Sequence, residues 1–305
     1  MKKNKILVLF FMIIFIHLNL SGNQYINHEV KAEIFPDQKK INVLDKIRLP
    51  DSFDKESIHI LLHGNLKLKP VSENIIIREV EGEIKARFFG INTAEFKVSD
   101  KIPLKHYEII FRKNAKDRIN IELAYSGEIY HELKQIGAEY ARGFSETPGI
   151  ISNKGVYLSG STFWVPWFNE KLVSFNLIVK SPEKWSSVSQ GKLIKDGEFS
   201  GKHISEWSSP DPMDEIYLIS APFHTYKIRS ENVNLFAYMR NKDDNLAMKY
   251  LNTTGQYLEM YNKLIGQYPY SKFALIENFW ETGYGMASFT LLGPKVIRFP
   301  FILHS

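Results

Sequence analysis

Apolar and polar residues alternate with a period of two along most of the chain between His28 and about Lys227. His28–Phe35 alternates in this way, a Pro-Asp turn follows, and Lys40–Leu49 again places its apolar residues on one face. A period of two is typical of β-strands with one buried face. Similar runs predict further strands at Ile58–Leu62, Asn74–Val80, Ala86–Phe89, His106–Phe111, Arg118–Tyr125, Leu172–Val179 and Ile216–Ser220. Short strands separated by turn residues predict a β-sandwich or a saddle-like assembly of sheets rather than βαβ units.

The period changes after Asn241, where apolar residues recur three and four positions apart and predict one amphipathic helix. Asp243 or Asp244 can cap its start, and Gly266 and Pro269 end it. The residues that define the helical face are Leu246, Tyr250, Thr254, Tyr257, Tyr261, Leu264 and Ile265.

A second domain is predicted to begin near Ser230, because Asn232–Tyr238 reads as the first strand of a mixed α and β pattern. Leu275–Ile276 and Phe289–Leu292 predict two more strands after the helix. The predicted organisation is therefore an N-terminal β domain at 23–229 and a mixed domain at 230–305.

Composition limits the classes of function. A chain of 305 residues with 13% aromatic residues can bury a sizeable core, and its net charge of +5 is small for its length. We find no basic segment interleaved with aromatic residues, so nucleic acid is not an expected partner. The chain contains no cysteine, so its stability must come from core burial rather than from disulfides.

Residues 1–22 have the layout of a secretory signal peptide. Three lysines precede the apolar run Ile6–Phe15, and small residues follow at Ser21 and Gly22. The alternative is a retained membrane anchor, but the apolar run is shorter than the roughly 20 residues that span a bilayer. We expect export to the periplasm or the exterior, with no stable membrane span after cleavage.

One pair of histidines has the spacing of a zinc motif. His59 and His63 are four residues apart, but Ile60 stands where a general-base glutamate would be. The segment reads as a strand, in which the two side chains would be roughly 13 Å apart, too far for one metal ion. The sequence also has no Gly-x-Ser-x-Gly elbow, so no catalytic and no metal-binding residue is predicted in this chain.

The segment around Gly283–Gly293 is the best candidate for substrate binding. Gly283, Gly285 and Gly293 flank or lie in a predicted strand, where glycine allows close approach of a peptide backbone and positive φ angles. The alternative is a β-bulge that serves folding only. Glu277 and Glu281 precede the segment and are either a carboxylate pair for acid/base work or solvated side chains.

Both predicted regions of the chain resemble the aminopeptidase N-type zinc metallopeptidases, the gluzincin group that includes leukotriene hydrolase. Tyr268–Leu275 followed by Gly283–Gly293 is the strongest part of this resemblance. Weaker landmarks in the same order are His28–Lys31, Ala124–Ile129, Gly155–Leu158 leading to Trp164–Pro166, Ser189–Leu193, and Trp207 and Pro210 ahead of Tyr217–Ala221.

The resemblance implies a saddle-like β domain followed by the start of an α+β thermolysin-like catalytic domain. In the family, a Gly-x-Met-Glu-Asn loop binds the substrate, and a helix with His-Glu-x-x-His later binds zinc. Aligned on Gly285 and Met286, the chain has Ala287 in place of the glutamate that binds the α-amino group, and Ser288 in place of the asparagine. The implied substrate-binding residues are Glu281, Gly283, Tyr284, Gly285, Met286, Ala287 and Ser288.

Two hypotheses follow. The first is that the chain is the N-terminal part of an exported zinc metallopeptidase, an aminopeptidase acting on peptides, that stops before the zinc motif. The full-length protein would then use zinc, and the chain alone would bind none and be inactive. The second is a non-catalytic exported binding or scaffold protein with a degenerate peptidase-like domain.

Overall fold

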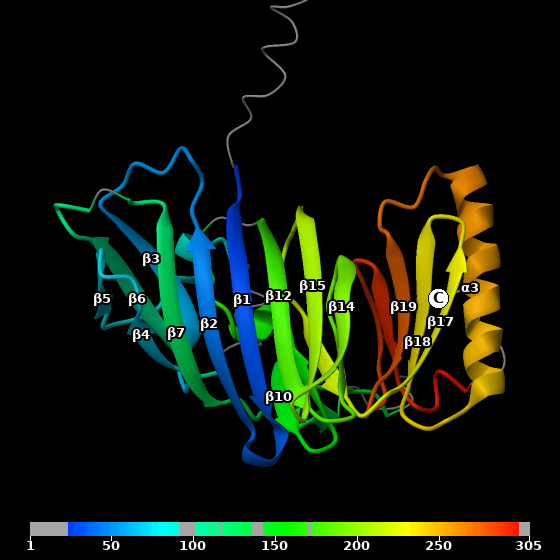
Figure 1. The fold of residues 1–305 in the computed structure, drawn as a ribbon. Coiled ribbons are helices and arrows are strands. Elements are labelled where there is room, and N and C mark those ends of the chain that lie inside the picture. Colours follow the sequence, from blue (N-terminus) through cyan, green and yellow to red (C-terminus); the bar gives the residue numbers. More distant parts are fainter. Residues whose placement is uncertain (1–23, 92–101, 116, 136–142, 170–171, 299–305) are drawn as a thin grey trace, which may run out of the picture.

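The computed structural model describes residues 24–91, 102–115, 117–135, 143–169 and 172–298. The predicted signal segment at 1–22 therefore lies outside the described residues. Within the described part, the architecture is mainly β, as predicted, with one long α-helix (Figure 1). No helix among the described residues combines the length and the hydrophobicity that a membrane span requires.

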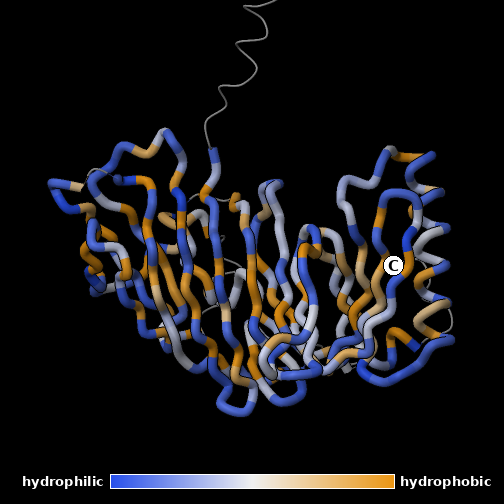
Figure 2. Tube along the Cα trace, in the orientation of Figure 1, coloured by the Kyte–Doolittle hydropathy of each residue, from blue (hydrophilic) through white to orange (hydrophobic). Residues whose placement is uncertain are grey.

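A seven-stranded sheet forms the largest layer, and it is drawn at the front of Figure 1. β1 and β2 pair in antiparallel register, β12 runs parallel to β1, and the remaining neighbours are antiparallel. Hydrophobic and hydrophilic residues alternate along these strands, as Figure 2 shows. In sheet order the strands are β14 (Lys192–Phe199), β15 (Lys202–Met213), β12 (Val173–Pro182), β1 (Ile26–Phe35), β2 (Lys40–Arg48), β7 (Asn120–Glu128) and β4 (Lys67–Pro70).

Three smaller sheets complete this part of the chain. One contains β10 (Gly149–Ser152), β11 (Gly155–Leu158), β16 (Leu218–Ala221) and β13 (Ser186–Val188), and another contains β3 (Ser57–His63), β6 (Leu104–Phe111) and β5 (Ile75–Glu79). β8 (Lys134–Gln135) and β9 (Ser145–Glu146) form a two-stranded ladder. Short 3₁₀ turns occur at Pro36–Gln38, Ala86–Phe89 and Gly160–Thr162.

The predicted strand at Ala86–Phe89 is wrong. These residues form a 3₁₀ turn that ends at Gly90, whose φ of 65° is a left-handed conformation that glycine adopts without strain. Phe89 is buried with Leu61 and Phe163 in a small apolar cluster. The buried aromatic residue of this segment therefore packs in a small cluster, and the segment does not pair with another strand.

A five-stranded sheet and the helix form the other end of the molecule (Figure 1). β18 (Val233–Met239), β19 (Lys272–Glu277) and β21 (Phe289–Leu292) are parallel, and β17 (His224–Ser230) and β20 (Gly283–Met286) are antiparallel edge strands. The predicted helix is confirmed as α3 (Asp244–Leu264), and the carboxylate of Asp243 accepts the N–H of Leu246 at its N-cap. The sheet begins at β17, before Ser230, so Ser230 lies at the β17–β18 turn.

The largest apolar cluster is continuous across the boundary predicted near Ser230. It joins Trp207 and Leu177 of the seven-stranded sheet to Phe236, Ile276 and Phe289 of the five-stranded sheet. A second cluster lies between the five-stranded sheet and α3. The β20–β21 hairpin, in which β20 is Gly283–Met286, is therefore packed against residues that precede Ser230.

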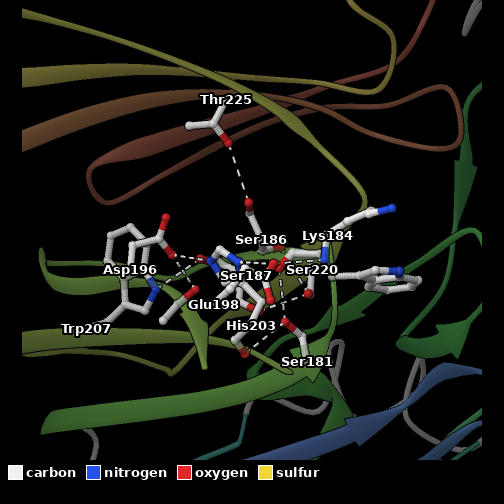
Figure 3. A network of polar contacts seen from close by, with 12 residues as sticks. Ser181, Lys184, Ser186, Ser187, Asp196, Glu198, His203, Trp207, Ser220 and Thr225 are labelled. Atoms are coloured by element: carbon white, nitrogen blue, oxygen red, sulfur yellow. Dashed lines mark hydrogen bonds and ion pairs between the residues drawn. The ribbon is translucent and has the colours of Figure 1, made fainter. Parts of the chain in front are cut away.

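A polar network occupies the end of the seven-stranded sheet near β14 and β15 (Figure 3). Nε2 of His203 lies 2.8 Å from a carboxylate oxygen of Asp196, and Nδ1 lies 3.0 Å from one of Glu198. Burial alone would lower the pKa of His203, but its contacts with the two carboxylates outweigh burial and raise it. The folded state therefore favours the imidazolium form of His203.

Replacing His203 by glutamine is expected to destabilise the protein more at about pH 5.5 than at about pH 8.5. A raised pKa gives stability that is fully present below the unfolded value of about 6.5 and is lost as the pH rises through the folded value. Urea unfolding of the wild type and of His203→Gln at both pH values checks this, with His224→Gln on the exposed edge as control. If His203→Gln lowers the free energy of unfolding by the same amount at both pH values, the assignment of a raised pKa to His203 is contradicted.

Candidate peptide-binding edge

β20 is an edge strand whose free side faces away from β21. The carbonyl of Thr282 accepts the N–H of Gly293, so residues 282, 284 and 286 direct their backbone groups toward β21. By the alternation of an antiparallel ladder, Gly283 and Gly285 direct their N–H and C=O groups to the free side. Free backbone groups of this kind can pair with an extended peptide.

The free side already receives one β-type hydrogen bond. The N–H of Ser145, in β9, donates to the carbonyl of Glu281 at 3.1 Å. The indole N–H of Trp280 donates to the carbonyl of Ser145 at 2.9 Å and holds the two segments together. β9 therefore ends beside the start of β20, and Gly283 and Gly285 continue the same edge beyond it.

The two faces of β20 differ. Tyr284 and Met286 pack against the large apolar cluster, whereas Gly283 and Gly285 are exposed and have no atom within 4 Å of where a Cβ would be. Neither of these glycines, nor Gly293, uses the positive φ angles that glycine permits. The pairing with β21 is regular, so the alternative of a bulge is also wrong.

Ala287 and Ser288 form the two-residue turn of the β20–β21 hairpin. Ser288 is 2% exposed and has a φ of 69°, a conformation uncommon for serine. Nζ of Lys272, on β19, lies 2.8 Å from Oγ and 3.1 Å from the carbonyl oxygen of Ser288. The turn is thus held by a lysine that is itself 1% exposed.

No carboxylate is a hydrogen-bond partner of Lys272 among the described residues. Its amine lies 5.1 Å from the ring of Trp207 and 5.3 Å from that of Phe289, contacts that favour a charge, but burial outweighs them. Burial lowers the pKa of the amine well below its ordinary value. Ser288 accepts two hydrogen bonds from this amine.

The two acids singled out from the sequence are engaged in structural contacts. Glu277 is buried, pairs with the guanidinium of Arg298 and accepts the N–H of Arg240 at 2.8 Å. Glu281 accepts the N–H of Lys295 at 2.9 Å. The solvated alternative is therefore wrong for the buried Glu277, whereas Glu281 is partly exposed; both contact residues that follow β21.

A group of aromatic side chains, two of them from before Ser230, lies beside β20. The ring of Tyr157 lies 5.3 Å from that of Trp280 and 6.4 Å from that of Tyr284, and Tyr217 lies 5.7 Å from Phe289. Burial raises the pKa of Tyr157 and of Tyr284, and the charge of Glu146 raises both further. These tyrosines are therefore neutral at ordinary pH.

Two further carboxylates lie near this group. Glu215 accepts the hydroxyl of Tyr217 at 2.6 Å and the N–H of Gly160. Glu146, at the end of β9, is exposed and close enough to Tyr157 and Tyr284 to raise their pKa. Sequence reasoning missed Glu146, Glu215 and Lys272, because only the fold brings them to the hairpin.

The described residues do not fit a catalytic zinc ion. Such a centre needs three protein ligands around one point, and no three His, Asp or Glu side chains of the described part are grouped in that way. The prediction that His59 and His63 lie on one strand is confirmed, since both belong to β3. Each of them contacts a different, distant histidine.

Comparison with solved structures finds the same fold in the M1 zinc metallopeptidase of Deinococcus radiodurans. One structure, of a mutant of that enzyme, has a TM-score of 0.61 and 12% identity over 91% of this chain. A second structure, of the enzyme without this mutation, has a TM-score of 0.59 and 12% identity over 89% of this chain. A third, of the mutant bound to a Tyr-Ser-Ala substrate, has 0.60 and 10% over 91%.

The chain spans 61–63% of the length of these structures. No family model and no curated protein sequence matches it. At such low identity the likeness establishes the fold alone. The chain is therefore similar in fold to the M1 zinc metallopeptidases over about nine tenths of its length.

Proposed function

We propose that the chain provides the peptide-binding edge of an exported, zinc-dependent aminopeptidase and is an N-terminal part of that enzyme. Residues 1–22 serve as the export signal in this proposal. The role given to the described residues is binding and orientation of a peptide, since they contain no grouped set of three metal ligands. The observation on which the proposal rests is the free edge of β20 at Gly283 and Gly285.

The edge suits a short peptide because its backbone groups point outward without side chains beside them. A substrate strand lying along Gly283 and Gly285 would continue the line of β9 beyond its end. It would exchange backbone hydrogen bonds with both glycines. Tyr284 and Met286 are packed inward and keep the strand in place. The substrate held by a structural neighbour, Tyr-Ser-Ala, has the length that such an edge accommodates.

Glu146 is the group we assign to the substrate's α-ammonium. Ala287 cannot provide the negative charge that the family has at this position, and Glu281 and Glu215 already accept backbone or hydroxyl hydrogen bonds. Glu146 is an exposed carboxylate near the ring of Tyr284, and a cation there also gains attraction from the aromatic faces. Binding of a free amine rather than a blocked one follows from this charge.

The second candidate function is peptide binding without hydrolysis. Ala287 in place of the family's glutamate favours it. In that case the same edge and the same carboxylate bind peptides, and no metal takes part.

The Glu146→Gln variant is expected to bind free Tyr-Ser-Ala about fivefold more weakly than the wild type, because an exposed ion pair contributes up to about 1 kcal/mol. Binding of N-acetyl-Tyr-Ser-Ala should be the same in both proteins. Isothermal titration of both peptides into wild type, Glu146→Gln and the control Glu83→Gln measures this. Equal losses for both peptides would reject Glu146 as the ammonium partner, and no binding of either peptide to the wild type would reject the proposed edge.

A further inference from the structure

Two histidine pairs lie along β3, away from the peptide-binding edge. Nδ1 of His59 is 2.9 Å from Nε2 of His106, and Nε2 of His63 is 2.8 Å from Nε2 of His131. In each pair a hydrogen bond requires that one of the two facing nitrogens carries the ring proton and that the other presents its lone pair. The two pairs differ in whether both facing nitrogens can be without a proton at the same time while both rings stay neutral.

The His63 pair is fixed as a hydrogen bond. Nδ1 of His63 accepts the backbone N–H of Asn65 at 3.2 Å, so the ring proton of neutral His63 is on Nε2, which donates to His131. Burial and the neighbouring His131 lower the pKa of His63 to about 4, which keeps it neutral. This pair has no free lone pair on the His63 side.

The His59 pair has no such constraint among the described contacts. The facing nitrogens of His59 and His106 can both be unprotonated when each ring has its proton on the outer nitrogen, toward solvent, since both side chains are partly exposed. Phe88 meets the ring of His59 edge-on at 5.4 Å, and Phe89 meets that of His106 at 5.1 Å. These contacts pack both imidazoles in place beside one another.

The spacing of the two nitrogens selects the kind of ion. Two nitrogens at about 2.0–2.1 Å from one ion lie about 2.9 Å apart at cis positions of a square plane and about 3.4 Å apart at tetrahedral angles. The observed 2.9 Å matches the first case without movement. Square-planar and tetragonal geometries are those of Cu²⁺ and Ni²⁺, and Cu²⁺ binds nitrogen ligands most tightly among the divalent ions of its row.

The charge around the pair is also suitable. Glu108 stands directly opposite His59 in the β3–β6 register, on the same face as His106. Its carboxylate pairs with Arg78 of β5 and supplies negative charge next to the imidazoles. An incoming divalent ion therefore meets two imidazole nitrogens and a nearby carboxylate that is itself paired with the guanidinium of Arg78.

We propose that His59 and His106 form a two-imidazole chelating site for Cu²⁺ on the β3–β6 sheet, with water in the remaining positions. The site is separate from the peptide-binding edge and does not depend on the function proposed above. With two protein ligands it holds an exchangeable ion and is distinct from the three-ligand centre of a zinc hydrolase.

Titration of the metal-free wild type with Cu²⁺ in a non-coordinating buffer, followed by calorimetry and electron paramagnetic resonance, tests the proposal. We expect one site whose spectrum shows two imidazole nitrogens. His59→Asn and His106→Asn should each weaken binding by at least about tenfold, since changes in outer-shell partners alone cost about 10–100-fold. His131→Asn and His224→Asn should leave the affinity unchanged.

Arg78→Gln gives a second, independent readout, because it frees the carboxylate of Glu108 and should tighten Cu²⁺ binding if the ion lies beside it. Circular dichroism of each variant confirms that it is folded before titration. Equal Cu²⁺ affinity in wild type and His106→Asn, or a spectrum with fewer than two imidazole nitrogens, would overturn the proposal. Loss of binding in His131→Asn alone would also overturn it, by placing the ion at the other pair.

Discussion

Replacing Lys272 by methionine is expected to remove a large part of the pH dependence of stability in the pH range below about 10. The amine is 1% exposed, and burial lowers its pKa well below the ordinary value near 10.5. In the unfolded chain the lysine is protonated up to that ordinary value. Between the lowered pKa of the folded state and this ordinary value, the unfolded state therefore binds more protons than the folded state.

This difference in bound protons determines whether stability rises or falls with pH. Where the unfolded state binds more protons, stability rises with pH, by at most about 1.4 kcal/mol per pH unit for one group. The wild type should thus become more stable toward pH 10, above which ionisation of tyrosines in the unfolded state reverses the trend, because buried Tyr125, Tyr217 and Tyr238 have raised pKa values.

Urea unfolding at several pH values in the wild type, Lys272→Met and the control Lys249→Met on the exposed face of α3 measures the slope. Methionine preserves the length and the apolar stem of the side chain but removes both hydrogen bonds to Ser288. Lys249→Met should retain the slope of the wild type. A slope in Lys272→Met equal to that of the wild type would mean that Lys272 is charged in the folded state.

The second large effect is expected at Gly293, the residue after β21. A Cβ built there would lie 2.6 Å from Cα and 2.5 Å from a carboxylate oxygen of Glu281, and 2.7 Å from the backbone nitrogen of Thr282. Two of these atoms are backbone and cannot rotate away. Gly293→Ala should therefore destabilise the protein by roughly 2–3 kcal/mol, in the upper range of overpacking effects.

Gly285→Ala is the matched control, since its Cβ would meet no atom within 4 Å. Its unfolding free energy should stay within about 1 kcal/mol of the wild type. Denaturant unfolding of the two variants under one condition makes the comparison. Similar losses at both positions would show that the hairpin is not packed as described.

Local patterns predicted much of the fold. The strands around Val30, Val43 and Ile109 and the face of α3 around Tyr250 and Leu251 are regular enough for period and capping to define them. The hairpin of β14 and β15 was missed, because its strands are rich in Ser, Lys and acidic residues and read as loop.

The site was only partly predictable for a different reason. Gly283, Gly285 and Tyr284 stand together in the sequence, so a substrate-binding strand could be proposed from it. Which backbone groups face outward depends on pairing with β21, and the role of Lys272 depends on burial by Trp207 from 65 positions earlier in the chain. Contacts between distant residues, such as His59 with His106, leave no local pattern.

The measurement that tests the central claim most directly is the affinity of Gly285→Pro for Tyr-Ser-Ala, compared with that of Gly285→Ala. Proline removes the N–H that faces the free edge but no bond to β21, so an edge strand tolerates it. We expect Gly285→Pro to keep an unfolding midpoint near that of Gly285→Ala and to lose about tenfold or more in peptide affinity. Unchanged peptide affinity in a folded Gly285→Pro protein would contradict the claim that the free edge of β20 binds the peptide.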